Sequence, residues 1–205
     1  NENRTAGVPS RENLDTATYW KQTYLQAAQN FSAPEVAGGM FDGEFSNDGD
    51  YVFLSRYDGG IHMYSTRSGK LVKKLPQARG GILGIGLSPD GNQLASFVFS
   101  GGMFIWDIES NQILKHHPLD RELTSSWNCV WSRDGKYVIS THMGGNLRIW
   151  NSETLEELGS SPLTGHRGDV HVLLVHPTRD EVWSASLDGS IRQWSIPDGK
   201  LLGTK

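Results

Sequence analysis

Cysteine and long apolar runs are nearly absent from this sequence. Cys129 is the only cysteine among the 205 residues, which excludes an intrachain disulfide and a cysteine-rich zinc site. No apolar run approaches the ~20 residues that span a bilayer, and the polar N-terminal stretch does not have the apolar core of a signal peptide. We therefore expect a soluble chain that is stabilised by packing, contacts no membrane and is favoured to be cytoplasmic.

Clusters of basic residues are also missing. Lys and Arg total 19 against 23 acidic residues, and the longest basic run is Lys73 with Lys74. A nucleic-acid-binding surface normally shows clustered basic residues, so nucleic acid is not an expected partner. The glycines follow no phosphate-binding pattern at a strand-to-helix junction. No nucleotide or other cofactor is predicted.

Glycine and tryptophan are abundant, and they repeat together. The chain has 24 Gly and 7 Trp. In four places a glycine is followed five residues later by an aromatic residue, and this aromatic recurs after 42, 44 and 44 residues. The pairs are Gly59 with Tyr64, Gly101 with Trp106, Gly145 with Trp150 and Gly189 with Trp194. A period of this length is typical of repeat architectures.

Each unit is predicted to hold four short strands separated by turns. In the second unit these strands are expected at residues 82–87, 93–97, 103–106 and 112–114. Residues 103–106 are apolar without alternation, so both faces of such a sheet must be covered. Radial stacking of the sheets meets this demand and protects their edges. The predicted fold class is therefore all-β, a β-propeller with about four four-stranded antiparallel blades.

The same units resemble the WD-repeat family, in which a unit runs from a Gly-His pair to a Trp-Asp pair. Trp106 and Asp107 form such a pair, and Gly165 with His166 opens the fourth unit. The ends of the other units are relaxed versions, namely Trp150-Asn151, Trp194-Ser195 and Tyr64-Ser65. The resemblance implies a propeller that usually closes with about seven blades, so four blades predict a partial ring. Three alternatives account for the partial ring: the missing blades lie in a longer protein, two chains self-associate, or the array stays open.

A buried polar network is a further implication of the resemblance. The matching residues in the fourth unit are His166, Ser184 (or, less well placed, Ser186), Asp188 and Trp194. The other units depart from the pattern: the first keeps Asp58 but has Tyr64 as its aromatic, and the equivalents of the turn aspartate in the next two are Ser100 and Gly144.

Three regions are predicted along the chain. Residues 1–11 form a flexible leader, residues 12–36 an N-terminal helix and linker, and residues 37–205 the propeller, with blades at about 37–76, 77–118, 119–160 and 161–205. Apolar residues at helical spacing indicate a helix at 15–31. Two interpretations of this helix stay open. In one, its apolar stripe packs on the first blade. In the other, residues 20–25 resemble the helical stretch that follows the F-box in F-box and WD-repeat proteins.

Catalysis is not expected. His166, Ser184 and Asp188 are the residue types of a nucleophilic triad, but Ser184 lies in an apolar strand and the structural network explains the same residues. No metal site is predicted, because His116 and His117 have no nearby ligands in sequence and His171 and His176 point to opposite faces of a strand.

A partner-binding face is predicted at the turns between the second and third strands. In the resembled family the residue before the turn aspartate faces this surface. The matching residues are Tyr57, Phe99, Met143 and Leu187, with Arg167 and Asp169 as weaker candidates at the edge. Apolar anchors of this kind dominate protein contacts, although they equally fit a role in packing against neighbouring blades.

The sequence therefore predicts a non-catalytic scaffold that binds proteins or peptides. Two alternatives are the substrate-receptor portion of an F-box and WD-repeat ubiquitin ligase, and a propeller attached to an enzymatic domain outside this chain. The family resemblance alone does not name a partner.

Overall fold

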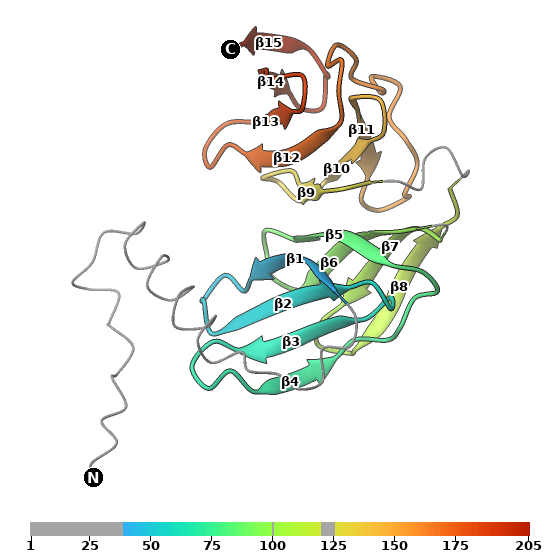
Figure 1. Ribbon diagram of the computed structural model, residues 1–205, viewed down its shortest axis with the longest axis vertical. Helices are drawn as coiled ribbons and strands as arrows, with labels where there is room; N and C mark the ends of the chain where they lie inside the picture. The colour runs from blue at the N-terminus through green and yellow to red at the C-terminus, as the bar shows by residue number, and fades with distance from the viewer. Residues whose placement is uncertain (1–38, 100, 120–125) are drawn as a thin grey trace, which may run out of the picture.

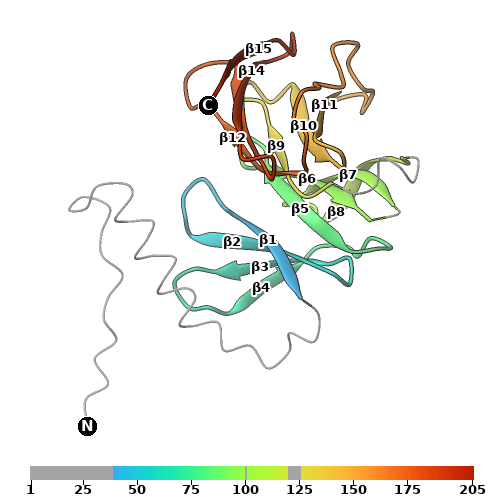
Figure 2. The same ribbon diagram turned by 45° about the horizontal axis from the view of Figure 1, so that its top comes forward.

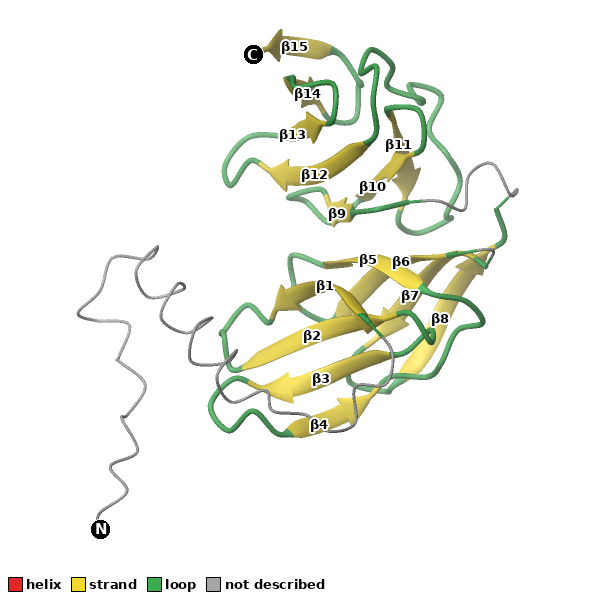
Figure 3. Cartoon of the chain, in the orientation of Figure 1, coloured by secondary structure: helices red, strands yellow, loops and turns green. Residues whose placement is uncertain are grey.

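The computed structural model describes residues 39–99, 101–119 and 126–205. Within these ranges all regular secondary structure is β-strand (Figure 3). None of the described residues forms a helix long and apolar enough to cross a membrane. The strands form four antiparallel sheets that follow one another along the chain (Figure 1). The all-β prediction is therefore confirmed.

Consecutive strands are neighbours in every sheet. The first sheet contains β1 (Met40–Phe45), β2 (Tyr51–Arg56), β3 (Ile61–Ser65) and β4 (Leu71–Lys74). The second contains β5 (Ile82–Leu87), β6 (Gln93–Val98), β7 (Gly102–Asp107) and β8 (Gln112–His117). The third contains β9 (Cys129–Trp131), β10 (Tyr137–His142) and β11 (Asn146–Asn151). The fourth contains β12 (Val170–Val175), β13 (Glu181–Ser186), β14 (Ile191–Ser195) and β15 (Leu201–Thr204).

The turn between the first two strands of a sheet is built by local hydrogen bonds. In the second sheet the Ser88 hydroxyl donates to Asp90 at 2.5 Å, and it accepts the Gln93 N–H at 2.9 Å. Gly91 has a φ of 78°, which a residue with a Cβ rarely adopts. Ser46 with Asp48 and Ser132 with Asp134 repeat the serine-to-aspartate bond at 2.5 and 2.7 Å. An Asp-Gly pair therefore occupies the same turn in the first three sheets.

The sheets are arranged as an arc, with the first strand of each nearest the middle. These inner strands are β1, β5, β9 and β12 (Figure 2). Three buried apolar layers fill the spaces between successive sheets. The first layer includes Phe53, Ile61 and Met63 with Ile82, Leu94 and Trp106. The second includes Phe97, Met103 and Ile105 with Cys129, Val138 and Trp150. The third includes Ile139, Leu147 and Ile149 with Val170, Val182 and Trp194.

The third sheet has three regular strands, so the prediction of four strands in every unit needs correction there. Leu147 pairs with Leu163, and Trp150 pairs with Glu157, each through an isolated bridge. Pro162 has no N–H to donate to a neighbouring strand, and the Ile149 N–H donates to the Ser161 hydroxyl at 3.1 Å rather than to a backbone carbonyl. A side chain therefore completes the pairing where a regular outer strand would continue.

The second unit shows how well turn positions locate strands. Its strands were expected at 82–87, 93–97, 103–106 and 112–114, and β5 to β8 begin within one residue of these positions. The largest difference is β8, which pairs with β7 as far as His117. Its residues are mostly exposed and show no apolar alternation, so the sequence pattern did not locate its end. The predicted helix at 15–31, its F-box-like stretch at 20–25 and Ser100 lie outside the described residues.

Packing between sheets predicts a large cost for a core truncation. Phe97 is 1% exposed in the second layer, whereas Leu114 on the outer strand β8 is 45% exposed. Phe97→Ala is expected to lower the free energy of unfolding by about 3–5 kcal/mol, because it removes buried apolar contacts and leaves a cavity. Leu114→Ala should change it by less than about 0.5 kcal/mol. Urea unfolding measures both, and equal effects would contradict the layered core.

Candidate functional site

In the fourth sheet one buried serine, Ser184, links two other buried side chains, those of Trp194 and His166. The Trp194 indole N–H donates to the Ser184 hydroxyl oxygen at 2.8 Å. The same hydroxyl lies 2.8 Å from Nε2 of His166. Nδ1 of His166 lies 3.1 Å from the Asp188 carboxylate. A neutral imidazole protonated at Nδ1 satisfies all three contacts, since Ser184 then donates to Nε2. Ser186 stands apart, and its hydroxyl donates to the Gly168 carbonyl at 2.7 Å.

The Asp188 carboxylate is held by a surface turn rather than by burial. The Ser190 hydroxyl donates to it at 2.7 Å, and the backbone N–H groups of Arg167 and Ser190 donate at 2.8 Å each. These hydrogen bonds, led by the Ser190 hydroxyl, hold the pKa of Asp188 well below its usual range. The carboxylate is therefore ionised at neutral pH and fixes the orientation of His166.

The connectivity of Asp188, His166 and Ser184 matches that of a catalytic triad, but the surroundings differ. Ser184 is 1% exposed, and its oxygen already accepts the Trp194 indole N–H. A nucleophilic hydroxyl must reach a substrate next to donors that stabilise an oxyanion. The geometry therefore favours a structural network that pairs buried polar groups.

Two other sheets repeat the tryptophan–serine contact. Trp106 donates to Ser96 and Trp150 donates to Ser140, both at 2.8 Å. In the third sheet the histidine partner is His142, whose Nε2 lies 2.7 Å from the Ser140 hydroxyl. His142 comes from β10 itself, two residues beyond Ser140, whereas His166 precedes β12. Sequence patterns missed it because no Gly-His pair marks the position.

The first sheet pairs its turn aspartate with an arginine. Arg56 is buried, and its guanidinium donates to the Asp58 carboxylate through Nε at 3.1 Å and Nη2 at 3.0 Å. The Arg56 guanidinium lowers the pKa of Asp58, and the carboxylate raises that of Arg56. An Arg two residues before an Asp-Gly turn is the only sequence signal for this pair.

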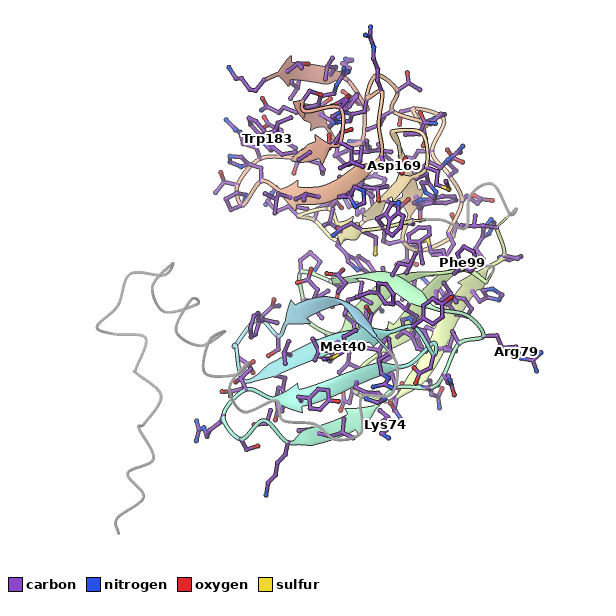
Figure 4. All side chains as sticks on the ribbon, viewed as in Figure 1. Met40, Lys74, Arg79, Phe99, Asp169 and Trp183 are labelled. Carbon is purple, nitrogen blue, oxygen red and sulfur yellow. The ribbon has the colours of Figure 1, made fainter. Side chains whose placement is uncertain are left out.

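The predicted partner-binding residues occupy equivalent turns. Tyr57 follows β2, Phe99 (labelled in Figure 4) follows β6, Met143 follows β10 and Leu187 follows β13. Their exposed fractions are 61, 47, 56 and 74%, in this order. We call the surface formed by these four residues the partner face. All four side chains are available to solvent.

Arg167 and Asp169 differ in whether their side chains are available for a partner. The Arg167 side chain is exposed, and its backbone is fixed by Asp188. The Asp169 carboxylate accepts the Gly144 N–H at 3.0 Å, and so joins the fourth sheet to the turn of the third. Asp169 is therefore a structural link between sheets.

Aromatic residues that the sequence did not single out lie at the same end of the sheets. Phe41, at the start of β1, lies 5.7 Å from Tyr57 between ring centroids. Trp127, just before β9, is 36% exposed and lies 5.2 Å from His171. The register is irregular at Phe41 and His171, and such bulges redirect side chains. Strict alternation therefore could not locate them.

No group of three or more His, Cys, Asp or Glu side chains in the described part of the chain has the geometry of a metal site. His176 uses Nδ1 to accept the backbone N–H groups of Thr178 and Arg179 at 3.2 and 3.1 Å. His116 stacks on Phe104 with ring centroids 4.2 Å apart. These histidines are engaged in local structure.

Comparison with known proteins agrees with the geometry of the repeat. The family model described as WD domain, G-beta repeat matches residues 109–151 and 157–195. The chain contains WD40 repeats. Each matched segment begins with the outer strand or outer segment of one sheet and ends with the third strand of the next. One WD40 repeat therefore contributes to two neighbouring sheets.

Relatives of this WD40 chain have diverse names. It is 34% identical over 74 residues to eukaryotic translation initiation factor 3 subunit I of Neurospora crassa. It is 36% identical over 76 residues to WD repeat-containing protein 75 of Xenopus laevis, and 30% identical over 81 residues to Jouberin of Mus musculus. The alignments cover 36, 37 and 37% of this chain but only 21, 9 and 8% of the relatives. The chain thus spans a small part of each.

The serine of the network predicts a measurable difference between sheets. Ser184→Ala leaves the Trp194 N–H and His166 Nε2 without this partner, whereas Ser96→Ala affects only the Trp106 N–H. Each buried group left unpaired costs about 1–3 kcal/mol. Ser184→Ala should therefore lower the free energy of unfolding by more than Ser96→Ala does. Urea unfolding tests this order, and a larger loss for Ser96→Ala would contradict it.

Asp188 predicts a pH dependence of stability. Its pKa is lowered by folding, so its contribution is complete above the unfolded value of about 3.9 and is lost as the pH falls through the lower folded value. The difference in unfolding free energy between the wild type and Asp188→Asn should be constant from pH 7 to about pH 5 and shrink by pH 3. Exposed Asp50→Asn is the control. A difference that does not change with pH would show that the ionised carboxylate is not stabilising.

Proposed function

We propose that the chain is a non-catalytic scaffold that binds a protein or peptide through the partner face. WD40 domains are generally protein-interaction modules. The observation that carries the proposal is the exposure of one apolar side chain at the same turn of all four sheets. These are Tyr57, Phe99, Met143 and Leu187, at 47–74% exposure.

Rigid positioning supports a binding role for this surface. Each of the four residues follows the second strand of a sheet, and the preceding strand residues Arg56, Val98 and His142 are buried. Loops that carry exposed side chains on a rigid scaffold are common binding sites. Apolar and aromatic anchors need little ordering on association when their backbone is already fixed.

Neighbouring side chains widen the surface. Phe41 and Tyr57 form one aromatic pair, and Trp127 and His171 form another. Arg167 adds an exposed charge, and its backbone N–H bonds to Asp188, the residue after Leu187. A surface with aromatic anchors and a polar edge is the pattern of a protein–protein contact. The initiation factor relative is itself named as a subunit, and a role of this chain within an assembly of proteins agrees with that likeness.

Substitution of the aromatic anchors tests the proposal. Tyr57→Ser with Phe99→Ser should reduce captured partners at least tenfold in a quantitative pull-down, since buried anchors contribute about 2 kcal/mol or more each. The matched control is Val72→Ser with Leu114→Ser, which removes two apolar side chains of similar exposure from outer strands. Near-ultraviolet circular dichroism checks the fold of both. The same partners in the same amounts from a folded double variant would contradict the proposal.

A further inference from the structure

A cavity of about 360 Å³ opens at the end of the sheets opposite to the partner face. It lies where the inner strands reach their first turns, and all four sheets contribute to it. Its wall is largely apolar and includes Leu87, Pro89, Trp131, Leu174 and Pro177. Glu44 of β1 is the one acidic side chain that lines it.

Glu44 occupies a position that is not acidic in the other sheets. It pairs with Phe53 in the strand register. The equivalent residues on β5, β9 and β12 are Gly86, Val130 and Leu174, which pair with Ala95, Ile139 and Trp183. An acid therefore replaces a residue that is elsewhere apolar or glycine. The hydrophobic repeat does not account for it.

The Glu44 carboxylate has no hydrogen bond or ion pair within residues 39–99, 101–119 and 126–205. Burial, and then the nearby charge of Asp42, raises the pKa of Glu44 to about 7. Asp42 differs, because it accepts the N–H groups of Ile85 and Gly43 at 3.0 and 2.9 Å. A carboxyl group in apolar surroundings without a partner is costly to ionise.

Other charges near the cavity leave Glu44 uncompensated. The Arg133 guanidinium is engaged by Asp180 at 3.2 Å. The first turns of three sheets carry Asp48, Asp90 and Asp134. Hydrogen bonds, first from a serine side chain and then from backbone N–H groups, lower the pKa of Asp48 and Asp90. Burial raises the pKa of Asp134, but hydrogen bonds from Ser132 and Lys136 outweigh it and lower this pKa overall. These carboxylates are ionised at neutral pH, so none of them offers Glu44 a positive charge.

We propose that this cavity binds a cationic side chain with an aliphatic stem, a lysine or arginine of a partner peptide, and that Glu44 pairs with its charge. The stem matches the apolar wall, because long basic side chains bury their methylenes while their charged group finds a polar partner. The charge supplies a counterion that Glu44 does not have among the described residues of the chain. This site is separate from the partner face and does not depend on it.

Three blocked tripeptides provide the probes: acetyl-Gly-Lys-Gly-amide, acetyl-Gly-Arg-Gly-amide and the uncharged norleucine analogue. Binding is followed by the NMR shift of the Trp131 indole, which lines the cavity. We expect saturable binding of a cationic peptide at pH 8, and at least tenfold weaker binding of the norleucine peptide. Glu44→Gln should weaken binding of the cationic peptide at least tenfold. Asp50 is an exposed acid at the same end, and Asp50→Asn should leave the affinity unchanged.

The pH dependence isolates the role of Glu44. Affinity of the wild type should rise between pH 6 and pH 8 as Glu44 ionises, and Glu44→Gln should lose this rise. The groups that face the region are Asp42, Arg133, His176 and Cys129; burial keeps the pKa of the Cys129 thiol well above its ordinary value, so it stays neutral. A rise that persists in Glu44→Gln would belong to another group and overturn the assignment.

Other outcomes also overturn the proposal. These are the absence of saturable binding for both cationic peptides, equal binding of the norleucine peptide, and equal losses in Glu44→Gln and Asp50→Asn. Thermal unfolding confirms that each variant is folded. If Glu44→Gln does not fold, Glu44→Met, which keeps the length of the side chain, takes its place with the same expected loss.

Discussion

The hydrogen bond from a third-strand tryptophan to a second-strand serine is the contact that three of the four described sheets share. It occurs at 2.8 Å in three sheets, as Trp106 with Ser96, Trp150 with Ser140 and Trp194 with Ser184. The N–H is satisfied within its own sheet while the ring packs in the layer shared with the preceding sheet. One side chain therefore fixes the register inside a sheet and the contact between sheets. An aromatic of this size also buries the largest apolar area available to a single residue.

The polar groups around this contact vary from sheet to sheet. A buried polar group needs a hydrogen-bond partner, but several residue types can supply it. His166 reaches Ser184 from outside the sheet, and His142 reaches Ser140 from within it. The first sheet uses Arg56 with Asp58 instead. The residue that follows the second strand of each sheet, in contrast, projects to solvent. Buried polar residues and exposed residues thus stand next to each other in these turns, so the exposed residue can change while the buried contacts keep the fold.

Residues close in sequence were predictable, and residues brought together by the arc were not. Turn glycines and the aromatic period located the sheets, and the Gly-His pair led to His166. Phe41 and His171 were missed because bulges interrupt the alternation on which strand patterns rest. The irregular outer segment of the third sheet depends on Pro162 and on a side-chain hydrogen bond. In the sequence Glu44 looks like an ordinary surface acid, and it lines a cavity only because the four inner strands meet there.

The exchange rates of the indole N–H groups, measured by NMR in deuterated solvent, test this account most directly. Trp106, Trp150 and Trp194 are buried and hydrogen-bonded, whereas Trp127 is 36% exposed. Groups of the first kind exchange only when the structure opens. The account predicts that these three indoles exchange far more slowly than Trp127 and at similar rates to one another. Exchange of any of the three as fast as Trp127 would contradict it, because that sheet would then lack the tryptophan–serine contact.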